Sequence, residues 1–215
     1  MPVWLTWIKE VVGRTLHKKQ MLLGMACVLV ITLLYSKSIQ YFYHFYPNWV
    51  NSELLINYGG GFVRRGLLGQ IAFLTRETFG ITPARCFLLL FSVAYLIQMF
   101  VFLWLSTLVR RKMYVLLFAL SPALLLFPAY DLSAFGRKDV FITLGLLLHS
   151  LLVVQSMTSD RIDKNYAKYF ITLIFPFVLI TVFVHEVQAF FMLHHIILTL
   201  LAPSGRWKNG CYQAI

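Results

Sequence analysis

Residues 86–109 read CFLLLFSVAYLIQMFVFLWLSTLV, an uncharged apolar run that ends at Arg110, Arg111 and Lys112. A helix needs about 20 apolar residues to cross the hydrocarbon core of a bilayer, so this run predicts a transmembrane helix. Across the chain, 60% of the 215 residues are hydrophobic and 13% are charged. A soluble domain carries about 25% charged residues. We therefore expect an all-α, polytopic transmembrane protein.

Six apolar segments are long enough, or nearly so, to span a bilayer. They cover residues 21–43, 86–109, 113–130, 140–157, 169–184 and 187–202. The mixed-charge residues 159–168 are expected to form a loop. Residues 66–79, which follow the first span, mix apolar and charged side chains in a pattern typical of an amphipathic helix at the membrane surface. Residues 1–215 are expected to form a single transmembrane domain.

The basic residues predict how these spans are oriented. With the N-terminus in the cytoplasm, twelve of the 19 Lys and Arg residues fall in cytoplasmic segments and seven on the outer side. Cytoplasmic loops of membrane proteins carry such an excess of Lys and Arg. We therefore predict six spans with both termini in the cytoplasm. The net charge of +11 is explained by this bias, so no nucleic-acid partner is expected.

The chain offers no pattern typical of a disulfide framework or a bound metal ion. Cys27, Cys86 and Cys211 have no paired spacing. His185 and Glu186 are adjacent, which does not place both on one helical face as a zinc site would need. No metal and no cofactor are expected. The first apolar run lacks a small-residue cleavage pattern and is expected to remain as an anchor.

The motif NYGGGFVRRGLLG at residues 57–69 contains five glycines and the pair Arg64 and Arg65. Glycine lets the backbone turn tightly and approach a ligand. Paired guanidinium groups suit phosphate or carboxylate. The alternative interpretation is a flexible turn whose two arginines reach toward lipid head groups.

Two further polar clusters fall on the same predicted side of the membrane. One is the loop 131–139, which ends in Arg137, Lys138 and Asp139, and the other is His185 with Glu186. Ionisable residues at membrane depth usually face a cavity or each other. Asp139 could also be an ordinary helix start favoured by the helix dipole. His185 and Glu186 could be a buried pair that joins the last two spans.

We expect the three clusters to share one pocket at the outer face, able to hold an anionic, lipid-linked substrate. The candidate substrate-binding residues are Tyr58, Gly60, Arg64, Arg65, Arg137 and Lys138. The candidate catalytic residues are Glu53, Asp139, His185 and Glu186. The cations would stabilise charge on the leaving group, and an acid or His185 would take a proton from the attacking hydroxyl. One of His194 and His195 is expected to be a polar group that packs helices together, and His149 and His44 are interpreted in the same way.

The motifs at residues 57–69, 135–139 (FGRKD) and 185–186 (HE) resemble those of bacterial multi-spanning proteins of surface-polysaccharide assembly. Those proteins are similar to O-antigen and exopolysaccharide polymerases and, more distantly, to membrane glycosyltransferases that use polyprenyl-linked sugars. The resemblance implies a bacterial inner-membrane location and a polyprenyl-linked glycan substrate. It implies phosphate binding by Arg64, Arg65 and Arg137. Glu53 would be the base, although it lacks the Asp-containing motif usual for the glycosyltransferases.

Such enzymes have more spans than this chain offers. The resemblance therefore implies the front part of a larger membrane enzyme, or a membrane-protein partner that supplies the missing spans. A non-catalytic accessory subunit and a small transporter are the alternatives. No internal repeat supports the transporter. The enzyme and accessory hypotheses differ in whether the three clusters converge.

Overall fold

The structure is a computed structural model that describes residues 36, 40, 49–63, 65–108, 135–158 and 160–202. Every regular element in these ranges is helical, which confirms the predicted all-α class for this part of the chain. The elements are α3 (Trp49–Leu54), α4 (Leu67–Phe79), α5 (Pro83–Leu108), α8 (Asp139–Thr158), α9 (Asp160–Tyr169), the π-helical turn η2 (Phe170–Ile174), α10 (Phe175–Val184) and α11 (Gln188–Leu201).

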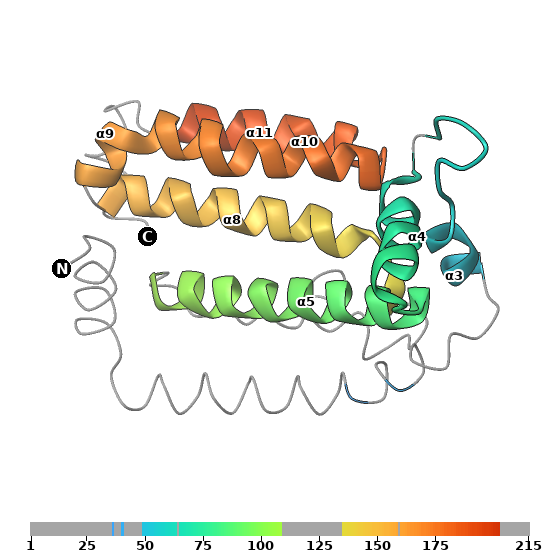
Figure 1. Ribbon diagram of the computed structural model, residues 1–215. Helices are drawn as coiled ribbons and strands as arrows, with labels where there is room; N and C mark the ends of the chain where they lie inside the picture. The colour runs from blue at the N-terminus through green and yellow to red at the C-terminus, as the bar shows by residue number, and fades with distance from the viewer. Residues whose placement is uncertain are drawn as a thin grey trace.

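The long helices lie side by side, and α4 crosses one end of them (Figure 1). α9 lies at the opposite end, where the chain turns from α8 into α10 (Figure 1). Because α8 runs away from the α4 end and α10 returns to it, the start of α8 and the end of α10 meet beside α4. Segments far apart in sequence are thereby brought together.

Three of the described helical segments are long and apolar enough to cross a membrane. They are Pro83–Leu108, Asp139–Met157 and Asn165–Val184. They cover the expected second, fourth and fifth spans. The expected sixth span is an apolar helix of 14 residues, Gln188–Leu201, shorter than the other three. The expected third span, residues 113–130, lies outside the described residues, and so does the expected first span, residues 21–43, apart from Ser36 and Gln40.

The prediction of a loop over residues 159–168 is wrong, because α9 occupies most of this segment. Its charged composition suggested a solvated connection between two spans. Tyr166 is buried and stacks on Phe170 and His149. His149 lies 17 residues away in the sequence, so the composition of the segment itself does not reveal this contact.

The chain passes from α9 into α10 through the π-helical turn η2, which ends two residues before Pro176. Proline has no backbone N–H and its ring clashes with the preceding helical turn. The N–H of Phe175 donates to the carbonyl of Phe170, five residues back, as in a π-helix. This wider turn carries the helix past Pro176 without ending it.

An aromatic core packs α4, α5 and the start of α8 together at one end of the bundle. Phe87 and Phe91 of α5 are fully buried against Phe135, Val140 and other apolar residues. The outward surface is apolar as well. Only 22% of the apolar 18-residue segment of the Asn165–Val184 helix is buried. Phe190 of α11 is 81% exposed. Soluble monomers rarely expose apolar patches of this extent. The outward surface therefore supports lipid contact.

Candidate functional site

Two glycines of the motif at residues 57–69 allow α4 to pack on the chain that precedes it. A Cβ atom at Gly69 would lie 2.0 Å from the carbonyl oxygen of Ile56, and one at Gly66 would lie 2.6 Å from the ring of Tyr58. The side-chain oxygen of Gln70 also accepts a hydrogen bond from the N–H of Tyr58, at 3.1 Å. These contacts fix the loop that carries Arg65.

The glycine run itself forms an exposed turn. Gly61 has a φ of 117°, a conformation that side-chain-bearing residues rarely adopt. Gly60 is exposed, and a Cβ there would meet no atom within 4 Å. The ring of Tyr58 stacks on that of Phe62, with centroids 5.7 Å apart. The run therefore shapes the loop, and neither Tyr58 nor Gly60 lines the cavity described below.

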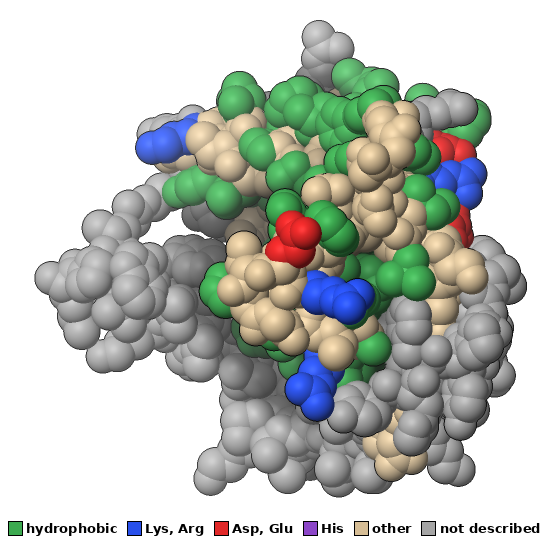
Figure 2. All heavy atoms as spheres, turned by 45° about the vertical axis from the view of Figure 1, so that its right-hand side comes forward, with side chains coloured by type: hydrophobic (Ala, Val, Ile, Leu, Met, Phe, Trp, Pro, Cys, Tyr) green, Lys and Arg blue, Asp and Glu red, His purple; other side chains and the backbone are tan. Residues whose placement is uncertain are grey.

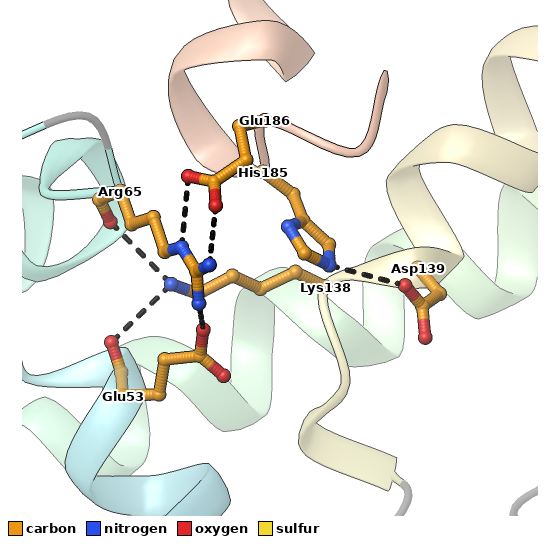
Figure 3. Close-up of polar contacts among 6 residues, drawn as sticks. All are labelled: Glu53, Arg65, Lys138, Asp139, His185 and Glu186. Atoms are coloured by element: carbon orange, nitrogen blue, oxygen red, sulfur yellow. Dashed lines mark hydrogen bonds and ion pairs between the residues drawn. The ribbon is translucent and has the colours of Figure 1, made fainter. Parts of the chain in front are cut away.

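Arg65 joins three segments of the chain (Figure 3). Its Nη1 lies 2.6 Å from Oε1 of Glu53 in α3. Its Nε donates to Oε2 of Glu186 at 2.8 Å, and its Nη2 pairs with the other oxygen of the same carboxylate. Such two-point contacts combine charge with fixed geometry. The hydrogen bonds that Arg65 donates to Glu186, and then the one to Glu53, raise the pKa of Arg65, so its charge is permanent.

Lys138 lies beneath this ion-pair network, with 5% of its surface exposed. Its Nζ donates to the backbone carbonyl oxygens of Glu53, at 3.2 Å, and Arg65, at 3.4 Å (Figure 3). Burial lowers the pKa of Lys138, an effect that the nearby Glu53 carboxylate opposes. The ammonium group therefore ties the start of α8 to α3 and to the loop that carries Arg65.

Asp139 begins α8 and contacts both a cation and a histidine. Its Oδ2 lies 2.8 Å from Nη2 of Arg137, and its Oδ1 lies 3.4 Å from Nε2 of His185. His185 follows the last residue of α10 in an extended conformation, which turns its ring toward α8. Its Nδ1 is buried without a hydrogen-bond partner among the described residues and faces the side of Arg65 and Lys138 (Figure 3).

Phe135 holds the FGRKD segment in place. Its side chain is 1% exposed, and its ring stacks on Tyr95 of α5 with centroids 5.1 Å apart. The centroid of its ring also lies 6.3 Å from that of Phe91. The charged residues that follow are thus attached to the aromatic core through a residue two positions before Arg137.

These groups surround a cavity of about 160 Å³ at the α4 end of the bundle. Its lining residues are Glu53, Leu54, Arg65, Gly136, Arg137, Lys138, Asp139 and His185. The cluster contains three cations, Arg65, Arg137 and Lys138, and three carboxylates, those of Glu53, Asp139 and Glu186. Its formal charge is therefore zero when His185 is neutral.

The same balance is visible on the surface. Positive and negative side chains lie in small groups among hydrophobic ones on the face of Figure 2, without a broad patch of either sign among the described residues. No group of three or more His, Cys, Asp or Glu residues in the described part of the chain could hold a metal ion. The site therefore offers individual charged groups around a small cavity.

Seven of the ten candidate site residues converge in this cluster: Glu53, Arg65, Arg137, Lys138, Asp139, His185 and Glu186. Tyr58 and Gly60 lie in the adjoining loop, and Arg64 lies outside the described residues. Sequence reasoning did not single out Leu54 and Gly136, which line the cavity, or Gln70, which fixes the loop. Of these three residues, only Gly136 could have been predicted from the sequence, because it directly precedes Arg137 in the FGRKD motif.

No known protein family matches this sequence, and neither does a curated protein or a solved structure.

Proposed function

We propose that this protein is a bacterial inner-membrane component of glycan assembly that binds a polyprenyl-linked sugar at the cavity beside α4. The observation that carries the proposal is the convergence of three sequence clusters around one cavity. Arg65 comes from the first cluster, Arg137 to Asp139 from the second and His185 from the third, and Glu53 of α3 lines the same cavity. Membrane-surface cavities with mixed charges suit a substrate that has a lipid tail and a polar head.

His185 is the general base in this proposal, and Asp139 is its orienting partner. The contact between Asp139 and Nε2 of His185 places the imidazole so that Nδ1 is left to accept a proton. The attacking hydroxyl would give its proton to Nδ1 while its oxygen bonds to the anomeric carbon. The carbon–oxygen bond to phosphate breaks, and the polyprenyl phosphate or pyrophosphate leaves with the bonding electron pair.

Arg137 and Lys138 line the cavity and would stabilise the negative charge on that leaving group. Arg65 has a different role from the phosphate binding expected for it, because two carboxylates already surround its guanidinium. Glu53 and Glu186 are likewise held as ion-pair partners. In this proposal Arg65, Glu53 and Glu186 position the cavity walls, and proton transfer belongs to His185.

The surroundings of the cavity favour a substrate with a lipid tail. Phe62, beside the glycine turn, is 73% exposed, and the outer faces of the long helices are apolar. The proposed topology is six spans with both termini in the cytoplasm and the cavity at the outer face. A membrane-protein partner would supply the spans that related enzymes have in addition.

The test is binding of a fluorescent polyprenyl-pyrophosphate glycan to the purified protein in lipid nanodiscs. Loss of one charge-assisted contact costs about 1.5 kcal/mol or more, so Arg137→Ala should weaken binding by about tenfold. Arg76→Ala is the matched control, because Arg76 is exposed on α4 and does not line the cavity. His185→Gln should keep binding and lose glycosyl transfer.

Absence of binding by the wild-type protein, or equal binding by Arg137→Ala and the wild type, would contradict the proposal. Either result would favour the second candidate function, a non-catalytic accessory subunit. The observation in favour of that alternative is that the carboxylates of the cluster pair with its own cations. In an accessory subunit, this network would serve helix assembly alone.

A further inference from the structure

A second polar cluster lies inside the helix bundle, separate from the cavity. Its members are fully or almost fully buried: His149 of α8 and Gln188 of α11 are 0% exposed, His195 of α11 is 4% exposed and Tyr166 of α9 is 5% exposed. Buried polar groups in a membrane bundle are costly unless they are paired. Here they pair with one another.

The four side chains form one continuous hydrogen-bonded chain. Nε2 of Gln188 lies 3.3 Å from Nε2 of His195, and Nδ1 of His195 lies 3.0 Å from Nδ1 of His149. Nε2 of His149 lies 2.8 Å from the hydroxyl oxygen of Tyr166. The two imidazole rings stack with centroids 5.2 Å apart. Each histidine therefore uses both of its ring nitrogens within the chain.

The donors can all point in one direction. A neutral imidazole carries one N–H and one acceptor nitrogen. If the amide of Gln188 donates to His195, then His195 donates from Nδ1 to Nδ1 of His149. His149 in turn donates from Nε2 to the oxygen of Tyr166. Every contact is satisfied, and the two histidines have opposite tautomers.

The reverse direction satisfies the chain equally well. Tyr166 then donates to His149, His149 donates to His195, and His195 donates from Nε2 toward Gln188. The amide oxygen of Gln188 is buried and has no partner among the described residues. Rotation of that amide would turn its oxygen toward His195 as the required acceptor. The chain thus has two internally consistent proton arrangements.

We propose that Gln188, His195, His149 and Tyr166 form a proton-transfer path through the interior of the bundle. A proton that arrives at Nε2 of His195 displaces the Nδ1 proton onto His149, whose Nε2 proton passes to Tyr166. Tyr166 releases its own hydroxyl proton to water. One proton enters and one leaves, so charge is conserved. Rotation of the hydroxyl, the rings and the amide restores the first arrangement.

The position of the path distinguishes it from the cavity. Gln188 begins α11 two residues after Glu186, and its N–H donates to the carbonyl oxygen of His185 at 3.0 Å. Tyr166 belongs to α9, at the opposite end of the bundle from α4 (Figure 1). The path leads from the end that holds the charged cluster toward the end formed by α9. It does not depend on the identity of a substrate.

The test is proton flux into liposomes that contain the purified protein and an internal pH-sensitive dye, driven by a potassium diffusion potential. Wild-type vesicles should take up protons faster than protein-free vesicles. Tyr166→Phe keeps the ring and removes the hydroxyl, and it should lower this flux about tenfold. His194→Gln is the matched control, because His194 adjoins His195 on α11 but is exposed; its flux should remain unchanged.

Wild-type flux equal to that of protein-free vesicles would overturn the proposal, as would equal flux through Tyr166→Phe and the wild type. Nitrogen-15 NMR of histidine-labelled wild-type protein is a second measurement that needs no variant. It should show His149 and His195 in opposite neutral tautomers. Identical tautomers would leave the contact between their Nδ1 atoms with no proton or with two, and would also overturn the path.

Discussion

Gly69 determines how closely α4 approaches the backbone of residues 54–56. The absence of a side chain lets the helix lie against the carbonyl groups of Leu54 and Ile56. Glu53 directly precedes residues 54–56, and Arg65 lies four residues before Gly69. The distance between α4 and this backbone segment therefore also affects the ion pair between Glu53 and Arg65. A packing residue outside the cavity thereby influences its wall.

We predict that Gly69→Ala destabilises the protein by about 1–3 kcal/mol, the usual cost of overpacking a close contact. The added methyl group would overlap the carbonyl of Ile56, so the helix or the backbone must move. Thermal unfolding in detergent measures the effect. Gly60→Ala, in the same motif but facing open space, should leave the unfolding temperature unchanged. Equal stability of the two variants would contradict the packing role.

Sequence reasoning identified most of the charged residues at the site but not their pairings. Arg, Lys, Asp, Glu and His at unusual positions in an apolar chain are visible locally. The partner of Arg65 is not, because Glu186 lies 121 residues away. The phosphate role expected for Arg65 assumed an unoccupied guanidinium. The role of each charge depended on a tertiary contact that no local pattern contains.

At the scale of elements, α8 is fixed at its start by the buried ring of Phe135. This residue attaches Arg137, Lys138 and Asp139 to α5. Without this aromatic contact, the segment would depend on the polar contacts of the cluster alone. Hydrophobic anchoring thus determines where the charged groups lie.

Phe135→Ala should destabilise the protein by about 3–5 kcal/mol, the usual cost of truncating a buried phenylalanine. The variant should also bind the fluorescent glycan more weakly, because Arg137 and Lys138 lose their anchor. Chemical unfolding and nanodisc binding measure the two effects. Phe79→Ala is the control, because Phe79 is 77% exposed at the end of α4 and should tolerate truncation. Unchanged binding by folded Phe135→Ala would show that the polar contacts suffice.

The helices of the spans were predictable and α9 was not, for a physical reason. A long apolar run leaves its backbone few ways to satisfy hydrogen bonds in lipid other than a helix. The segment of α9 is polar, and its helix depends partly on burial of Tyr166 against α8. The π-helical turn before Pro176 is a similar case, since proline in a sequence signals a disturbance without specifying its form.

At the scale of the whole molecule, the bundle has two distinct ends. The glycine turn and the charged cluster lie beside α4, and the end of α9 lies at the other side (Figure 1). If the long helices cross the membrane, these two ends face opposite compartments. In the proposed topology, with both termini in the cytoplasm, the α4 end would face the outside.

Single cysteines at positions 60 and 168 should therefore react with a membrane-impermeant maleimide from opposite sides of the cell membrane. Gly60→Cys should be labelled in intact cells and Lys168→Cys only after permeabilisation, since both positions are exposed. Cys27, Cys86 and Cys211 are first replaced by serine. The reverse labelling would invert the topology, and labelling of both positions in intact cells would contradict the spans between them.

The long sequence separation between Arg65 and Glu186 also has a consequence for biosynthesis. Ribosomes add about 5–20 residues per second, so Glu186 is made on the order of ten seconds after Arg65. Until then the guanidinium has only Glu53 from this trio, and the cavity lacks the wall that His185 provides. The nascent protein must hold these charges without their partner, and synthesis of the connection between α10 and α11 completes the site.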